Sequence, residues 1–294
     1  MSTIQYEVYR PWKSCFFISL QHNSDSKKMK FRLFVVVAIS QTILSACGPT
    51  QPQQAAKKIA LAEALLAKGD TSNSLLYLDS VSVLYPKALA EAKSALQISN
   101  RIYVSKLMKQ RENLVAAKSA IDSLIKEFNP EKGEFDKSTN YVYNNQGINK
   151  TWSHSFIQVV VNENGDLTLS SNYYGEQWIN HTSIIIGGDG LTAKTDSVPL
   201  DNVNNHHSEF SGSNWEKVTY NGSHADKVIA LIAANSDKKL KSTFKGKTSY
   251  IIWLEESDKK AIKTAYDLSR AIKVKTASEK KIPVLEKKMK SDGQ

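Results

Sequence analysis

The sequence predicts an α+β protein: an N-terminal helical hairpin or bundle, or a coiled-coil stalk, followed by an antiparallel-sheet domain with about two helices. Residues 55–130 are rich in Ala, Leu, Lys and Ser and place apolar residues at helical spacing. Residues 135–275 are enriched in Asn, Tyr, Trp, Thr and Gly, and turn residues separate short runs of alternating apolar and polar residues. Helices and strands in separate stretches of a chain are typical of the α+β class.

A secretory signal is predicted before these two parts. Basic residues between positions 27 and 32 precede the apolar run 33–44, and small residues follow it, which is the pattern of a cleaved signal. A membrane-spanning helix needs about 20 apolar residues, and this run is shorter. We therefore expect residues 1–46 to be removed. Because the pattern opens at Met29, we also expect translation to start there and residues 1–28 to be absent from the natural product.

The end of the apolar run, Leu44-Ser45-Ala46-Cys47, resembles the lipobox of bacterial lipoproteins. This resemblance implies that the Cys47 thiol receives a diacylglycerol and that the new N-terminal amine is acylated, because several acyl chains are needed for a stable anchor. Gly48 stands where an inner-membrane retention signal has Asp, so we expect an outer-membrane protein that faces the periplasm. Residues 47–54 are expected to form a polar, lipidated tether. A cysteine that ends a core helix by coincidence is the alternative.

Removal of the signal changes the charge and the cysteine count. The chain carries a net charge of +10, and the mature chain carries +6 because residues 1–46 hold six basic and two acidic residues. Cys15 is lost with the signal, so no disulfide is expected. Nucleic acid is a poor partner for an exported protein. The basic tail, residues 276–294, is interpreted as a solvated helix end, with contact to anionic lipid or cell-wall polymers as the alternative.

The first helices of residues 55–130 resemble one tetratricopeptide repeat. Gly69 and Asp70 break an apolar-periodic segment, and Pro86 ends the next one. The positions that match the repeat are Leu61, Ala62, Leu65, Gly69, Ser74, Leu78 and Pro86. Lys58 and Val81 depart from it. About three repeats are normally needed to bury their faces, and the sequence shows one.

Residues 87–128 are predicted to form one long helix or a bent pair, which Asn129-Pro130 ends. The apolar residues recur at steps of mostly three and four, namely Leu96, Tyr103, Leu107, Leu114, Ala117, Ile121, Leu124 and Phe128. Two interpretations stay open, with the first favoured: a bundle that packs on itself, or a coiled-coil arm that pairs with an envelope protein or with a second copy.

Strands and two short helices are predicted in residues 135–275. Asn164-Gly165 joins two alternating runs between positions 156 and 169 and predicts a hairpin. Further strands are expected at 182–186, 215–220, 240–244 and 250–254, with a hairpin turn at 187–190. Ser223 and Ser257 are expected to cap the helices.

The run Tyr173-Tyr174-Gly175-Glu176-Gln177-Trp178, followed by a strand that ends at Gly188-Asp189-Gly190, resembles a domain of many exported bacterial proteins of uncharacterised role. Phe244-Lys245-Gly246, before a strand and a final helix, belongs to the same resemblance. It covers residues 135–275 and implies no catalytic signature.

Aromatic residues are the strongest binding candidates. Tyr173, Tyr174, Trp178 and Trp215 are hypothesised to form a stacking platform for sugars or a protein hot spot, and Trp152 and Trp253 belong to the same group. Aromatic residues on strands are more often part of the core, and this interpretation is favoured.

Catalytic and metal-binding patterns are weak. His206-His207 with Asp201 and Glu209 is the one cluster to test for a metal, but adjacent residues of an extended segment point apart, so a polar loop is favoured. Ser153-His154 and Asp166 offer triad residue types without a nucleophile elbow. The Gly187–Gly190 run lacks the Lys-Ser/Thr of a phosphate loop. We expect no catalytic residues, no metal and no cofactor.

The sequence therefore favours a lipid-anchored cell-envelope protein that acts as a binding or assembly module. The first alternative is a glycan- or peptidoglycan-binding lipoprotein that uses the aromatic strands. The second is an envelope hydrolase that uses His206 and Glu209.

Overall fold

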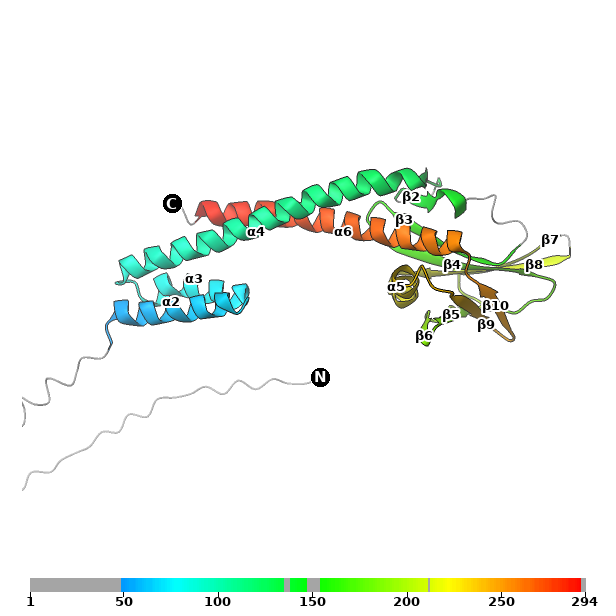
Figure 1. The fold of residues 1–294 in the computed structure, drawn as a ribbon, viewed down its shortest axis with the longest axis horizontal. Coiled ribbons are helices and arrows are strands. Elements are labelled where there is room, and N and C mark those ends of the chain that lie inside the picture. The colour runs from blue at the N-terminus through cyan, green and yellow to red at the C-terminus, as the bar shows by residue number, and fades with distance from the viewer. Residues whose placement is uncertain (1–48, 135–137, 147–153, 211, 292–294) are drawn as a thin grey trace, which may run out of the picture.

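The protein is elongated, with a helical arm at one end and a sheet domain at the other (Figure 1). The computed structural model describes residues 49–134, 138–146, 154–210 and 212–291. The predicted α+β class is confirmed. The proposed signal and Cys47 lie outside the described residues, as do Trp152 and Ser153. No helix in the described ranges is long and apolar enough to cross a membrane.

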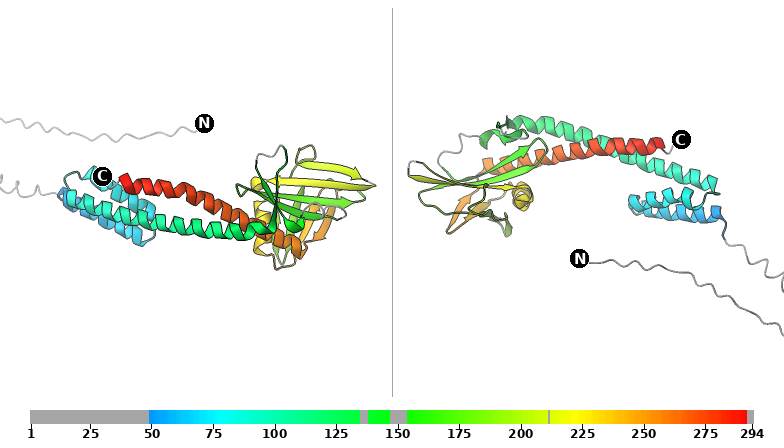
Figure 2. Two further views of the ribbon diagram at one scale, coloured as in Figure 1. Left: turned by 90° about the horizontal axis from the view of Figure 1, so that it is seen from above. Right: turned by 180° about the vertical axis from the view of Figure 1, so that it is seen from behind.

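Four helices build the arm: α2 (Gln51–Ala67), α3 (Thr71–Leu84), α4 (Leu89–Leu124) and the C-terminal half of α6 (Glu256–Ser291). α4 runs toward the sheet domain and α6 returns beside it in all views (Figures 1 and 2). The Arg111 guanidinium lies 2.7 Å from the Glu286 carboxylate across this pair. Each helix of the pair has 36 residues, which corresponds to about 54 Å.

Local signals set the helix ends. The Gln53 side chain accepts a hydrogen bond from the Thr50 N–H at the start of α2, and the Asp70 carboxylate accepts one from the Asn73 N–H at the start of α3. Gly69, between the two helices, adopts φ +83°, which glycine accommodates without strain. The predicted break at Gly69-Asp70 is therefore confirmed.

The hydrophobic core of the arm contains side chains from near both ends of the described chain. Buried side chains of α2, α3 and α4 form it, and Leu285 and Met289 of α6 pack against it. Three domain boundaries therefore differ from the prediction, and one is that the segment Phe128–Glu131, at the end of the predicted helical domain, is a strand of the sheet domain. The helix α2 begins at Gln51, inside the expected tether. Residues 276–291 form part of the arm and are not a solvated end, because Ser278, Leu285 and Met289 contact the other helices.

The sheet domain contains two antiparallel sheets. The first has the order β1-β2-β3-β4-β8-β7 and the second β10-β9-β5-β6. The strands of the first sheet are β1 (Phe128–Glu131), β2 (Asn140–Tyr143), β3 (Phe156–Asn162), β4 (Leu167–Gly175), β7 (Asn205–Phe210) and β8 (Ser213–Asn221). Those of the second are β5 (Ser183–Gly188), β6 (Leu191–Lys194), β9 (Lys241–Lys245) and β10 (Ser249–Trp253).

One hydrophobic core lies between the sheets. The inner face of the first sheet, the inner face of the second sheet, α5 (Asp226–Ala234) and the N-terminal half of α6 all contribute buried side chains. The predicted hairpin at Asn164-Gly165 is confirmed and is fixed to α6, since the Ser269 hydroxyl donates a 2.6 Å hydrogen bond to the Gly165 carbonyl. The helix α6 therefore belongs to both cores.

Four strands were not predicted: β1, β2, β6 and β7. They are short or lack apolar alternation, and β7 has the sequence Asn-His-His-Ser-Glu-Phe. The segment with His206 and His207 is thus a strand and not the expected loop, because its backbone pairs with β8.

We predict that Phe244→Ala lowers the free energy of unfolding by about 3–5 kcal/mol, because Phe244 is fully buried between the sheets. The matched control is Thr243→Ala on the opposite face of β9, which is half-buried and is expected to cost less than about 1 kcal/mol. Urea unfolding followed by circular dichroism measures both. Equal losses would contradict the assignment of the faces.

Candidate functional site

The four aromatic candidates occupy three separate places. Tyr173 is 4% exposed and belongs to the core between the sheets. Tyr174 and Trp215 lie opposite each other on the outer face of β4 and β8, with ring centroids 6.1 Å apart. Trp178 packs against His207 at the edge of the first sheet, and their ring centroids are 5.1 Å apart. The structure thus brings two of the four together and does not gather them in one open groove.

The histidine cluster does not converge on a metal. His206 lies opposite Lys217 and His207 opposite Glu216, so the two side chains leave β7 on opposite faces. Glu209 is exposed on the same strand, and Asp201 is exposed in the preceding loop. Within the described ranges, no group of three or more His, Cys, Asp or Glu residues is arranged to hold a metal ion.

The remaining candidates have local roles. His154 packs near Phe156, with ring centroids 5.7 Å apart. Asp166 accepts a hydrogen bond from the Asn162 side chain inside the β3–β4 hairpin. The predicted turn lies at Asp189 and Gly190, which both have positive φ, whereas Gly187 and Gly188 belong to β5 and pair with β6. Trp253 lies on β10 and is 65% exposed.

A buried carboxylate, Glu216 of β8, organises a polar cluster between the two sheets. One oxygen accepts hydrogen bonds from the Ile179 and Asn180 N–H groups, both at 2.7 Å. The other accepts from the His181 N–H at 2.8 Å and contacts His181 Nδ1 at 2.6 Å. Glu216 and His181 are both fully buried, and a buried charge of this kind is stable only when it is fully paired.

His181 extends the cluster to the next strands. Its Nε2 lies 2.8 Å from the Ser171 hydroxyl, which lies 3.2 Å from the Tyr220 hydroxyl. Burial raises the pKa of Tyr220 to about 12, so the phenol is neutral at physiological pH. Ser171, His181 and Glu216 follow the hydrogen-bond order of a hydrolase triad. All three are fully buried, so a substrate cannot reach Ser171, and the cluster is structural.

The pKa of the Glu216 carboxyl is lowered. Burial alone would raise it, but hydrogen bonds from the His181 side chain and from the His181 and Asn180 N–H groups together outweigh burial. The stabilisation from Glu216 is therefore complete above the ordinary carboxyl pKa of about 4.5. It is lost as the pH falls through the lower pKa of the folded state.

Glu216 fixes the crossover, which we define as residues 176–182 between the two sheets. Asn180 in the crossover adopts φ +52°, an unusual conformation for a residue other than glycine that its surroundings must enforce. On the other side, Gly246 packs so closely on the Ile179 and Asn180 carbonyls that an added Cβ would overlap them. No sequence pattern predicts this cluster, because its members lie 10 and 35 positions apart and match no motif spacing.

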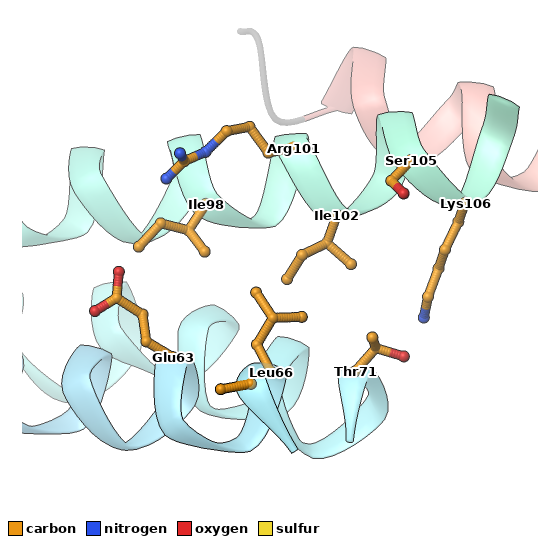
Figure 3. Close-up of a pocket in the computed structure, with 9 residues that line it drawn as sticks. Glu63, Leu66, Thr71, Ile98, Arg101, Ile102, Ser105 and Lys106 are labelled. Carbon is orange, nitrogen blue, oxygen red and sulfur yellow. The ribbon is translucent and has the colours of Figure 1, made fainter. Parts of the chain in front are cut away.

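An open cleft lies on the arm, where the α2–α3 turn faces α4 (Figure 3). It has a volume of about 540 Å³. Leu66 extends from α2 toward Ile98 and Ile102 of α4 and forms an apolar floor, with Glu63 and Arg101 at one end and Lys106 at the other.

An exposed apolar stripe continues along α4. Val104, Met108 and Val115 are 39%, 58% and 69% exposed and follow steps of four and seven residues, so they lie on one side of the helix. Arg111, three residues after Met108 and four before Val115, lies on the same side and pairs with Glu286 of α6. The cleft and the stripe together form the arm surface, which is the candidate functional site. The stripe and the α4 side of the cleft fall within residues 87–128, for which contact with a partner was the second interpretation of the sequence, whereas Glu63, Leu66, Ala67 and Thr71 of the cleft lie before this range.

In comparisons with known proteins, no family model matches the sequence, and no curated protein and no solved structure matches it. The functional argument therefore depends on the geometry of the chain itself.

We predict that Glu216→Gln lowers the free energy of unfolding at pH 7 by about 3 kcal/mol, because an amide cannot replace a carboxylate that accepts four hydrogen bonds. Acidification to below pH 4 should reduce the difference between the parent and the variant. Urea unfolding at both pH values measures this. Glu209→Gln, which changes an exposed acid on the neighbouring strand, is the control and should leave the free energy of unfolding unchanged at both pH values. An equal loss of stability from Glu216→Gln at both pH values would contradict the pKa argument.

Proposed function

We propose that this protein is a lipid-anchored module of the bacterial cell envelope, attached through Cys47, which uses its helical arm for binding or assembly. The observation that carries the proposal is the separation of the two ends of the molecule. The described chain begins at the free end of the arm, and the sheet domain lies at the opposite end of the α4–α6 pair (Figure 1).

The free end of the arm is fixed close to the beginning of the chain. The Gln51 side chain, in the first residue of α2, accepts a 3.0 Å hydrogen bond from the Lys87 N–H between α3 and α4. Cys47 precedes Gln51 by four residues, which span at most about 14 Å. A lipid on Cys47 would therefore hold this end of the arm at the membrane and direct the sheet domain away from it.

The same end has the chemistry of a membrane-proximal surface. We call residues 83–89 the tip. Val83, Leu84 and Leu89 in the tip are 77%, 51% and 77% exposed. Lys87 in the tip is exposed, and the tip contains no acidic residue. Apolar side chains beside lysines favour contact with anionic lipid.

The arm surface supports the assembly role. Isolated exposed apolar residues are normal on proteins, but an apolar stripe beside an apolar cleft is typical of a contact for a partner. The partner would be an envelope protein, since the anchored arm is reached from the same compartment.

The anchor predicts that Cys47→Ser moves the protein from the membrane fraction to the soluble fraction of cells, because the proposed lipid attachment site is removed. Fractionation with immunodetection measures the distribution, and mass spectrometry of the N-terminal peptide measures the added lipid. Thr50→Ser, a conservative change three residues after Cys47, is the matched control and should leave the protein in the membrane. Unchanged membrane association of Cys47→Ser would refute the anchor.

The arm surface predicts that Met108→Glu reduces a protein cross-link in intact cells at least severalfold, because it places a charge in the apolar stripe. Ala116→Glu is the control: Ala116 is exposed on the same helix but points about 100° away from Val115. Cross-linking followed by mass spectrometry measures both. If the two variants give the cross-links of the parent protein, α4 is not the contact.

A further inference from the structure

We propose that the outer edge of β10 pairs with β10 of a second copy of this chain, so that the two small sheets become one continuous antiparallel sheet. The inference gives the proposed assembly role a defined interface at the sheet domain, remote from the anchor. It depends on the edge of the sheet, the sequence of the strand and the charges at its two ends.

The strand β10 ends the second sheet, and its backbone directs hydrogen-bonding groups outward. The Leu254 N–H donates to the Leu240 carbonyl, and the Gly246 N–H donates to the Thr248 carbonyl. In an antiparallel pair such contacts alternate along the strand. The even-numbered residues of β10 therefore bond to β9, and the N–H and C=O groups of Ser249, Ile251 and Trp253 point away from it. Among the described residues, no strand covers this edge.

The other sheet edges carry features that oppose pairing, and β10 does not. Charged side chains (lysines in particular), prolines and β-bulges commonly protect exposed sheet edges from pairing with another chain. β1 contains Pro130, β7 contains two histidines and a glutamate, and β6 is four residues long and contains Lys194. β10 has the sequence Ser-Tyr-Ile-Ile-Trp without a charge. A natural edge with this sequence and exposure is expected to have a partner.

The exposed side chains of β10 favour a second copy. Ile251 and Trp253 are 54% and 65% exposed and lie on the same face of the strand. A two-fold axis at Ile251 places Ile251 opposite its copy and Trp253 opposite Ser249. All three outward-facing residues then pair, with about six backbone hydrogen bonds. The two isoleucines and two tryptophans form one apolar strip across the junction.

Charges beyond the two ends of the strand favour the same antiparallel orientation. Lys247 lies in the β9–β10 turn, and Glu255 precedes α6, where its carbonyl accepts hydrogen bonds from the Asp258 and Lys259 N–H groups. Both side chains are exposed. The two-fold axis at Ile251 places the end of β10 that carries Lys247 in each copy beside the end that carries Glu255 in the other, so opposite charges adjoin there. An isologous contact of this kind closes as a dimer and does not extend into a fibre.

Sedimentation of the full chain with Cys47→Ser tests the proposal without interference from lipid. We expect a dimer, and we expect Ile251→Lys to raise its dissociation constant at least tenfold. Thr192→Lys, on the opposite edge strand β6, should leave it unchanged. Circular dichroism checks that each variant is folded, which is expected because both positions are exposed.

Charge reversal tests the register. Lys247→Glu should raise the dissociation constant about fivefold, and Lys247→Glu with Glu255→Lys should restore it. A protein that is monomeric at about 100 µM overturns the proposal, and the edge of β10 would then pair with a strand of a different protein. A dimer that Ile251→Lys does not weaken also overturns the proposal, because the dimer would then form through another surface. Either result is separate from the cellular fractionation of Cys47→Ser, so failure of this interface and failure of the anchor are distinguishable.

Discussion

The sheet domain depends on the ionised carboxylate of Glu216. Three consecutive N–H groups and one histidine side chain bond to it, and all belong to the segment that carries the chain from the first sheet to the second. The position of β5, and therefore of the strands that pair with it, follows from this contact. Burial of the charge costs free energy, and this cost is offset because both oxygens of the carboxylate accept hydrogen bonds from the crossover. The left-handed Asn180 and the tightly packed Gly246 show that the surrounding backbone is shaped around this segment.

The junction between the arm and the sheet domain uses a second polar contact of the same kind. The Tyr143 hydroxyl donates a 2.7 Å hydrogen bond to Glu127, which follows α4, and Lys260 of α6 lies 3.3 Å from the same carboxylate. The hydrogen bond from Tyr143 is the main reason why the pKa of Glu127 is lowered, with Lys260 adding to it. This exposed contact is weaker than the one at Glu216 because water screens it. It joins the end of α4, β2 and the beginning of α6 at one point.

The turns, helix breaks and strands that depend on a few neighbouring residues could be predicted from the sequence. The Asn164-Gly165 turn, the Gly69-Asp70 break and the apolar strands were predictable because the turn geometry and the period of two or 3.6 are set within a few residues. The strand β7 was not predictable, since its polar sequence forms a strand only because β8 supplies a pairing partner. The Glu216 cluster was equally hidden, because its members meet only after the two sheets pack. The apolar residues of α4 were predicted as a helix seam, but which of them face α6 and which face solvent depends on the position of α6 in space.

The helix α6 contributes side chains to both hydrophobic cores, and Pro283 removes one hydrogen bond from it within the arm. Loss of the sheet domain core would remove Ile262, Leu268 and their neighbours from their contacts and would also release Leu285 and Met289 from the arm. Because the two cores share one helix, unfolding of either core exposes apolar side chains that the same helix carries into the other. We therefore expect the arm and the sheet domain to unfold together, although each has a core of its own.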